Sequence, residues 1–224
     1  MDPKDIKDKI TEAFKKHMTS PDDRSFDIVP NLTKGKLYEA HVLSLIARDL
    51  SLKEGLQLEL INSNYIALRS SHGPIDRQYP HIAVSRGGSV VAEIWTDIEF
   101  LTLSYSMSAQ VTPVSRGYYH ELDILVVNPG ITGRPTHDDV WLGVESKNTG
   151  YGKGLLKEIL GVRRELSLLH SPNLPTKFLT WPDTSVPARP PSCLLVYASD
   201  IKVLKYTDPG LAFGIKFYHE LLKP

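Results

Sequence analysis

The stretch WLGVESK, residues 141–147, ends an apolar segment with a glutamate and a lysine that stand two positions apart. It follows ELDILVVN, residues 121–128, whose centre is continuously apolar and rich in β-branched side chains. Short apolar runs of this kind, bounded by glycine, proline and asparagine, are typical of buried strands. We therefore predict strands over residues 121–128 and 140–147.

These two predicted strands carry charged side chains on defined faces. Successive side chains of a strand point to opposite faces. Asp123 therefore shares a face with Leu125, and Glu145 and Lys147 share a face with Gly143. The glycine would leave room on that face for the backbone of a substrate. Two carboxylates and an ammonium at the ends of neighbouring apolar strands predict a compact site.

Helices and strands are expected to alternate around this pair. Gly87 and Gly88 separate two apolar runs and indicate a two-residue hairpin. Residues 100–105 either continue the preceding strand or begin a helix. Residues 171–192 contain six prolines and predict a long loop, which suggests a functional or partner surface. The expected helices are 3–18, 35–50 and 153–169, and the further expected strands are 56–68 with a turn at 62–64, 81–86, 89–95, 193–198 and 213–218.

The helix expected over residues 35–50 carries a further acidic candidate. Thr33 is a suitable N-cap. Glu39 lies one turn before Leu43 on an apolar stripe, where a carboxylate is costly unless it has a partner. Tyr38 and Val42 belong to a competing apolar face, so a rotated helix with an exposed Glu39 remains the alternative.

The chain has the length and composition of one globular domain. It has 224 residues, of which 41% are hydrophobic and 23% charged. Asp2 can cap the first helix, and Pro3 suits its first turn. We expect an N-terminal helix and linker over residues 1–30, followed by a single domain over 31–224.

Charge and cysteine usage limit the expected environment. Lys plus Arg and Asp plus Glu both total 26, so any affinity for nucleic acid must come from local clusters. No apolar run approaches the roughly 20 residues of a membrane span, and the charged N-terminus lacks the apolar core of a signal peptide. Cys193 is the one cysteine, so no internal disulfide can form. A cytoplasmic protein without membrane contact is expected.

The two carboxylates and the lysine suit the hydrolysis of a phosphodiester. The reaction builds negative charge on phosphorus, which a hard cation offsets. Mg²⁺ prefers oxygen ligands and keeps several waters, so carboxylates suffice to anchor it. A nearby lysine can orient or deprotonate the attacking water, or stabilise the transition state. An E-x-K pair on a solvent-facing strand is the alternative interpretation of these residues.

In their order along the chain, these residues resemble the PD-(D/E)xK nuclease superfamily. The likeness consists of Glu39 on an early helix, Asp123 on a strand, and Glu145-Ser146-Lys147 on the next strand, before a helix. It covers roughly residues 35–198 and departs from the family at His120-Glu121-Leu122, since no proline precedes Asp123.

The resemblance implies a fold and a set of roles. The fold is α/β and restriction-endonuclease-like, with a central mixed β-sheet flanked by helices. Asp123, Glu145 and Glu39 would hold the metal, Mg²⁺ with Mn²⁺ as a substitute. All three would serve catalysis together with Lys147.

Contact with nucleic acid is expected at the helix that follows Lys147. Lys153 and Lys157 lie one turn apart at its start, where the helix dipole also favours phosphate. A solvated helix face is the alternative explanation of these lysines.

Two functions from different classes follow. The first is a Mg²⁺-dependent DNA endonuclease of the PD-(D/E)xK type, which by family analogy would serve prokaryotic restriction or anti-phage defence. The second is a binding or assembly module that has the same fold with a degenerate site and acts with a partner protein. The lack of a basic tail favours an accessory role or a homodimer whose interface forms the DNA cleft.

Overall fold

The computed structural model describes residues 3–19, 27–28, 32–108 and 113–222, which form an α/β fold. The helices are α1 (Pro3–His17), α2 (Lys34–Leu52), α3 (Leu103–Met107), α4 (Lys153–Leu166) and α5 (Thr207–Leu211), with the 3₁₀ helices η2 (Arg116–Tyr118), η3 (His137–Asp139) and η4 (Ile201–Tyr206). The strands are β1 (Asp27–Ile28), β2 (Gln57–Ile61), β3 (Tyr65–Ile66), β4 (His81–Arg86), β5 (Ser89–Leu101), β6 (Tyr119–Val127), β7 (Val140–Lys147), β8 (Leu168–Pro175), β9 (Ser185–Arg189), β10 (Cys193–Ala198) and β11 (Ile215–His219).

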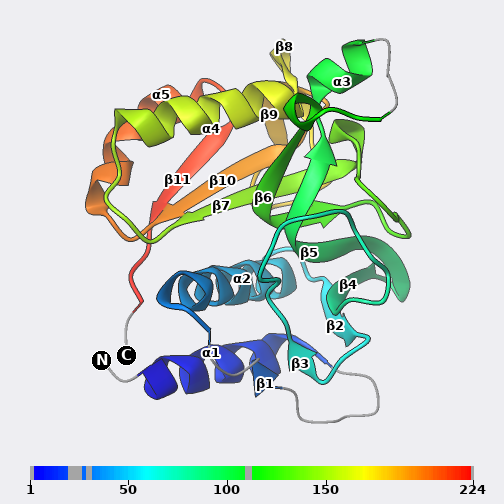
Figure 1. The fold of residues 1–224 in the computed structure, drawn as a ribbon, viewed down its shortest axis with the longest axis vertical. Helices are drawn as coiled ribbons and strands as arrows, with labels where there is room; N and C mark the ends of the chain where they lie inside the picture. The colour runs from blue at the N-terminus through cyan, green and yellow to red at the C-terminus, as the bar shows by residue number, and fades with distance from the viewer. Residues whose placement is uncertain (1–2, 20–26, 29–31, 109–112, 223–224) are drawn as a thin grey trace.

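A large central sheet organises the described residues. Its seven strands follow the order β11–β10–β7–β6–β5–β4–β2. The pairs of β10 with β7 and β11 are parallel, and the other pairs are antiparallel, so the sheet is mixed. Helices α1 and α2 lie on one face, and α4 and α5 lie on the other (Figure 1). The two faces are called the α2 face and the α4 face below.

Helix α2 is buried along both of the apolar stripes expected from its sequence. Leu43 and Ile46 are buried, and so are Tyr38 and Val42, because α2 packs between the sheet and α1. The Thr33 side chain accepts a hydrogen bond from the backbone N–H of Lys36, which confirms the predicted cap.

Helix α1 contributes to the same core. Ile6, Ile10 and Phe14, which recur every fourth residue, are all buried. Helix α1 ends at His17 rather than Met18. The predicted cap at Asp2 lies outside the described residues.

The glycine hairpin is confirmed, and two neighbouring segments differ from expectation. Gly87 and Gly88 have φ angles of 59° and 81° between β4 and β5, in the left-handed region that suits glycine. Strand β5 continues to Leu101 and α3 begins at Leu103, so residues 100–105 hold both elements. Strand β3 pairs with β1 instead of β2, so the 56–68 segment is split between two sheets.

The prediction of a long loop over residues 171–192 is wrong. Strands β8 and β9 pair as an antiparallel two-stranded sheet with an irregular register. In a two-stranded sheet every strand is an edge, so a proline without an N–H is tolerated on the outward side. Helix α4 consequently ends at Leu166, three residues earlier than expected, and Leu168 already belongs to β8.

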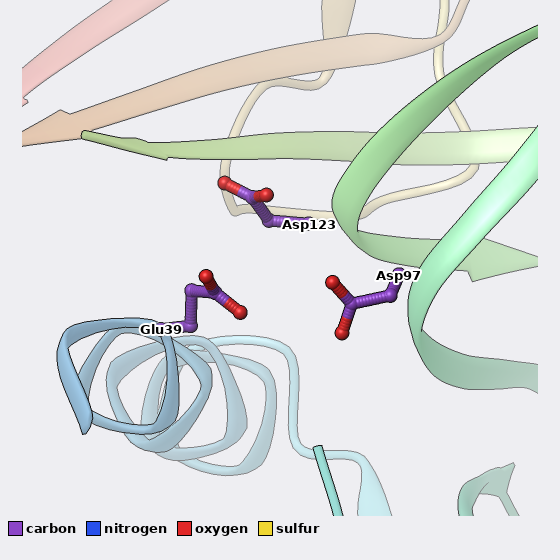
Figure 2. Close-up of side chains that lie close together, drawn as sticks. All are labelled: Glu39, Asp97 and Asp123. Atoms are coloured by element: carbon purple, nitrogen blue, oxygen red, sulfur yellow. The ribbon is translucent and has the colours of Figure 1, made fainter. Parts of the chain in front are cut away.

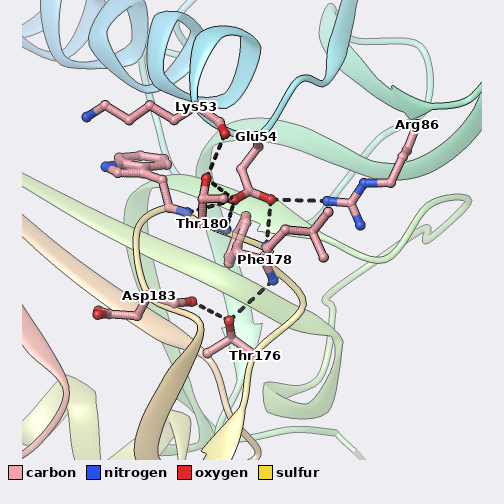
Figure 3. Close-up of polar contacts among 9 residues, drawn as sticks. Lys53, Glu54, Arg86, Thr176, Phe178, Thr180 and Asp183 are labelled. Atoms are coloured by element: carbon pink, nitrogen blue, oxygen red, sulfur yellow. Dashed lines mark hydrogen bonds and ion pairs between the residues drawn. The ribbon is translucent and has the colours of Figure 1, made fainter.

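The segment between β8 and β9 is attached to the end of α2 by one buried carboxylate. Glu54 accepts backbone hydrogen bonds from Leu179 at 2.8 Å, Trp181 at 2.6 Å and Thr180 (Figure 3). The Thr180 hydroxyl and the Arg86 guanidinium also contact it, at 2.9 and 3.1 Å. The Glu54 side chain is fully buried, so these donors replace the water it has lost.

The remaining strands fall close to their predicted positions. Strands β7 and β10 have the expected bounds, while β6 begins at Tyr119 and β11 ends at His219. Cys193 is buried, as expected for a small apolar residue next to Leu194. Across the described part of the chain, none of the helices combines the length and apolar character that a membrane span requires.

Candidate metal centre

Three carboxylates from separate elements meet between α2 and the sheet. Glu39 comes from α2, Asp97 from β5 and Asp123 from β6 (Figure 2). One oxygen of each lies within 4.8 Å of an oxygen of the others. These three side chains are called the carboxylate cluster below.

Asp97 faces α2 because β5 changes its alternation at this residue. Before it, Ile94 belongs to the core on the α2 face. After it, Ile98 belongs to the core on the α4 face, although strict alternation would place both on one face. Asp97 itself has a φ of 54°, a left-handed conformation that asparagine and aspartate adopt more readily than most residues.

Strand β6 pairs with β5, and its side-chain alternation is also interrupted, at Asp123. Ile124 packs on the α2 face, whereas Leu122 and Leu125 both pack on the α4 face. The prediction that Asp123 shares a face with Leu125 is therefore wrong. The carboxylate lies with Glu39, because the side-chain alternation of β6 is interrupted next to it.

The ammonium of Lys36 lies between two members of the cluster. Its Nζ is 2.6 Å from Glu39 Oε2 and also donates to Asp97 Oδ1. The second oxygen, Asp97 Oδ2, is buried and has no hydrogen-bond partner in the described part of the chain. A buried acceptor without a partner is uncommon, and this oxygen remains available to ligate a cation.

Burial raises the pKa of every carboxyl group in the cluster. For Glu39, burial and the charge of Asp123 outweigh Lys36 and raise the pKa to about 7. For Asp97, burial raises the pKa against the opposing effect of Lys36. For Asp123, burial raises the pKa although a backbone hydrogen bond and Lys147 favour the charged form. Since each group is costly to ionise here, a bound cation would stabilise all three charges.

Asp123 connects the cluster to the strand that carries the E-x-K sequence. The backbone N–H of Ser146 donates to Asp123 Oδ2 at 2.6 Å. The regular pairing of β6 with β7 reaches Ile124 and Val144 and stops there. The carboxylate of Asp123 thus takes a backbone donor where the two strands separate.

Glu145, which is buried, and Lys147, which is half-buried, form an ion pair on either side of Ser146 in β7. Lys147 Nζ is 2.7 Å from Glu145 Oε2 and 3.5 Å from Glu158 of α4. Burial, and then the charge of Asp123, raise the pKa of Glu145 to about 8. The carboxylates around Lys147 raise its pKa although burial lowers it, so its ammonium stays charged.

The sequence-predicted ligands are thus only partly brought together. Glu39 and Asp123 meet, while Glu145 lies outside the 4.8 Å group and contacts Lys147 instead. Its assignment as a ligand stays a prediction. Gly143 does not leave room for a substrate, because a Cβ there would lie 2.7 Å from the Leu122 side chain, so the glycine is required for packing.

The predicted nucleic-acid contacts lie at the start of α4. Lys153 and Lys157 are both exposed. Gly152, the N-cap, provides no side-chain hydrogen bond, so the first backbone N–H groups of α4 receive no side-chain cap. Glu158, one position after Lys157, reaches Lys147 and links this helix to the Glu145–Lys147 pair.

Sequence reasoning missed Asp97 and Lys36. An acid in the middle of the apolar run IWTDIEFL, residues 94–101, was the available signal for Asp97. Such a residue in a central strand requires a partner or a ligand. Lys36 had no comparable signal, because a lysine in the first turns of a helix is ordinary.

The donor set of the cluster fits a small hard divalent cation. All of its potential ligands are carboxylate oxygens, which Mg²⁺ and Mn²⁺ prefer, and Asp97 Oδ2 is a buried acceptor without a described donor. Comparison of the chain with protein-family models, with curated proteins and with solved structures gave no match. The chemistry of the site therefore has to be inferred from its own geometry.

Proposed function

We propose that this protein is a metal-dependent endonuclease that hydrolyses phosphodiester bonds in DNA, with a restriction-endonuclease-like fold. The observation that carries the proposal is the convergence of Glu39, Asp97 and Asp123, with Asp123 bonded to the backbone of Ser146 between the paired Glu145 and Lys147. The mixed sheet with helices on both faces agrees with this fold class.

The carboxylate cluster would hold Mg²⁺, with Mn²⁺ as a substitute. When bound, the ion would supply a Lewis acid for the phosphate and lower the pKa of a bound water. Glu39, Asp97 and Asp123 contribute the negative charge and the oxygen atoms. The hydrogen bond from Ser146 fixes one oxygen of Asp123 in orientation.

Lys147 acts as a fixed positive charge in this proposal. Its raised pKa makes it a poor general base at neutral pH, because a base must first lose its proton. An ammonium here instead stabilises negative charge on the phosphate as the transition state forms. Glu145 keeps Lys147 charged and in place, and it remains a predicted further ligand.

DNA is the proposed substrate, and the cellular role follows from the family resemblance alone. Lys153 and Lys157 supply exposed positive charge at the end of α4 nearest the Glu145–Lys147 pair. The formal net charge is zero, so a homodimer or a partner protein would add to the DNA surface. A role in prokaryotic restriction or anti-phage defence is proposed on the same analogy.

One assay distinguishes this function from a binding module with a degenerate site. The purified protein is incubated with plasmid, linear duplex, single-stranded DNA and RNA, each with Mg²⁺, Mn²⁺ or EDTA. We expect cleavage of DNA with either metal and none in EDTA. A preparation that binds DNA but leaves all four substrates intact with both metals would support the binding module instead.

A further inference from the structure

We propose that Lys36 is a built-in cation of the metal centre: its ammonium occupies the metal-free carboxylate cluster and is displaced when a divalent ion binds. This inference rests on the proposed metal-binding role of Glu39, Asp97 and Asp123. It adds a regulatory part to that site, because metal binding becomes an exchange of one cation for another.

The position of the ammonium carries the inference. Lys36 Nζ contacts one oxygen of Glu39 and one of Asp97, two side chains that come from different elements. These oxygens belong to the groups that converge within 4.8 Å. A divalent ion ligated by both carboxylates would need the space next to them that the ammonium now fills.

The charge count shows why the exchange is favourable for a divalent ion. When all three carboxyl groups are ionised, their negative charge exceeds the single positive charge of Lys36, and Asp97 Oδ2 has no partner among the described residues. An ammonium offers three N–H donors but cannot coordinate several oxygens in the way a small divalent ion does. Replacing one positive charge with two would compensate the cluster more fully.

The chain also allows Lys36 to leave. Its side chain is 21% exposed and that of Asp97 is 11% exposed, so the lysine is the more accessible of the two and has a path to water. It stands in the first turn of α2, and its long flexible stem can turn outward without any change in the helix. Only a side-chain rotation is required for the exchange.

Titration with Mn²⁺, followed by electron paramagnetic resonance of the free ion, tests the inference without any substrate. Lys36→Met removes the competing charge, so we expect it to bind Mn²⁺ about tenfold or more tightly than the unaltered protein. Lys34→Met is the matched control, since it removes an exposed charge from the same helix and should leave the affinity unchanged.

The two proposals fail in distinguishable ways. If neither the unaltered protein nor Lys36→Met binds Mn²⁺, the proposed metal centre is wrong. If both bind Mn²⁺ with equal affinity, the metal centre stands and the role of Lys36 is overturned. Equal gains in Lys36→Met and Lys34→Met would also overturn it, because the effect would then be one of general charge.

A crystal structure of the unaltered protein with Mn²⁺ gives a second test that does not depend on any variant folding. We expect an anomalous peak at the carboxylate cluster, with Lys36 Nζ moved away from both Glu39 and Asp97. A peak at the cluster with Lys36 still bonded to both carboxylates would overturn the inference.

Discussion

Asp97 combines three unusual properties at the scale of a single residue. It is an acid in the middle of an apolar strand, its φ is 54°, and its Oδ2 is buried without a described partner. Left-handed backbone and an unsatisfied buried oxygen each cost free energy, and such costs concentrate at functional sites. We therefore include Asp97 among the proposed metal ligands, although the family resemblance does not include it.

Asp97→Asn tests that assignment. Asparagine tolerates the left-handed backbone and has the same shape, so the fold should be kept while a charged ligand is lost. We expect metal-dependent DNA cleavage to fall by about 100-fold or more, in line with the loss of a charge-stabilising group. Glu121→Gln is the control, since Glu121 is an exposed acid of the neighbouring strand that pairs with His72. Equal activity of Asp97→Asn and the unaltered protein would remove Asp97 from the site.

Lys147→Ala separates catalysis from metal binding. An ammonium cannot ligate a cation, so the variant should lose cleavage and keep its affinity for Mn²⁺. It should also melt at a lower temperature, because Glu145 is only 5% exposed and would be left without its partner. Calorimetric titration of the folded variant with Mn²⁺ measures that affinity. If metal binding is lost, Lys147 holds the metal ligands in position and its role is not limited to the chemical step.

At the scale of elements, the sequence predicts the strands of the site better than their side-chain directions. The bounds of β7 follow from a continuous apolar run that ends in charge. Strict alternation then fails for Asp123, because the faces change at Asp97 and Asp123 on adjacent strands. Such a local change depends on the pairing of β5 with β6, which one strand's sequence does not contain.

The segment between α4 and β10 shows a second limit. Its prolines predict a loop, yet Pro172 and Pro175 lie within β8. A proline is tolerated in a strand where its position would point an N–H group away from the neighbouring strand. Which positions these are depends on the pairing of the sheet and cannot be read from one strand's sequence. The hydrogen bond that attaches this segment to Glu54 likewise joins residues that lie 125 positions apart in the sequence, so local patterns do not predict it.

Helix α4 is expected to contact the DNA backbone through its first turns. Lys153→Ala/Lys157→Ala should weaken binding to all sequences alike and lower the salt slope by about 1.8, or about 0.9 per lost contact. Binding is measured in Ca²⁺, which fills oxygen sites without supporting rapid hydrolysis. Lys202→Ala/Lys205→Ala removes two exposed lysines of η4 and serves as the control. If the Lys153/Lys157 variant binds DNA with the same affinity and salt slope as the Lys202/Lys205 variant, the lysines of α4 are solvated and do not contact DNA.

Glu54→Gln should destabilise the protein through the β8–β9 segment. The carboxylate of Glu54 accepts hydrogen bonds from the N–H groups of Leu179 and Trp181. The glutamine side chain would turn an N–H group toward one of these donors, which should lower the free energy of unfolding by about 2–3 kcal/mol. For a chain of this size that is roughly 5–10 °C in melting temperature. Glu59→Gln, an exposed acid on β2, should leave the melting temperature almost unchanged.

The same carboxyl group predicts a pH dependence. Burial by itself would raise the pKa of Glu54, but the N–H groups of Leu179, Trp181 and Thr180 outweigh it and lower the pKa. A lowered pKa in the folded state contributes stability above the ordinary value of 4.5, and that contribution is lost as the pH falls through the folded value. The difference in melting temperature between Glu54→Gln and the unaltered protein should therefore be largest near pH 7 and shrink in acid. A difference that is constant from pH 7 to pH 3 would contradict this account.

At the scale of the whole molecule, the mixed sheet places the site between its two helical layers. The carboxylate cluster lies on the α2 face, while the Glu145–Lys147 pair contacts α4 on the other. Asp123 joins them through Ser146, at the point where β6 and β7 separate. Apolar periodicity predicted the main helices and the strands of the site but not β8 and β9, and the convergence of α2, β5 and β6 depends on packing across the whole core.

The central claim is that Asp123 and its neighbours hold a metal that hydrolyses DNA. The most direct measurement is single-turnover cleavage of plasmid DNA in Mg²⁺ by the unaltered protein, Asp123→Asn and Glu145→Gln, with folding checked by circular dichroism. We predict that the unaltered protein cleaves, that both variants are inactive while folded, and that EDTA abolishes the cleavage. Cleavage that persists in EDTA, or in both folded variants, would contradict the account.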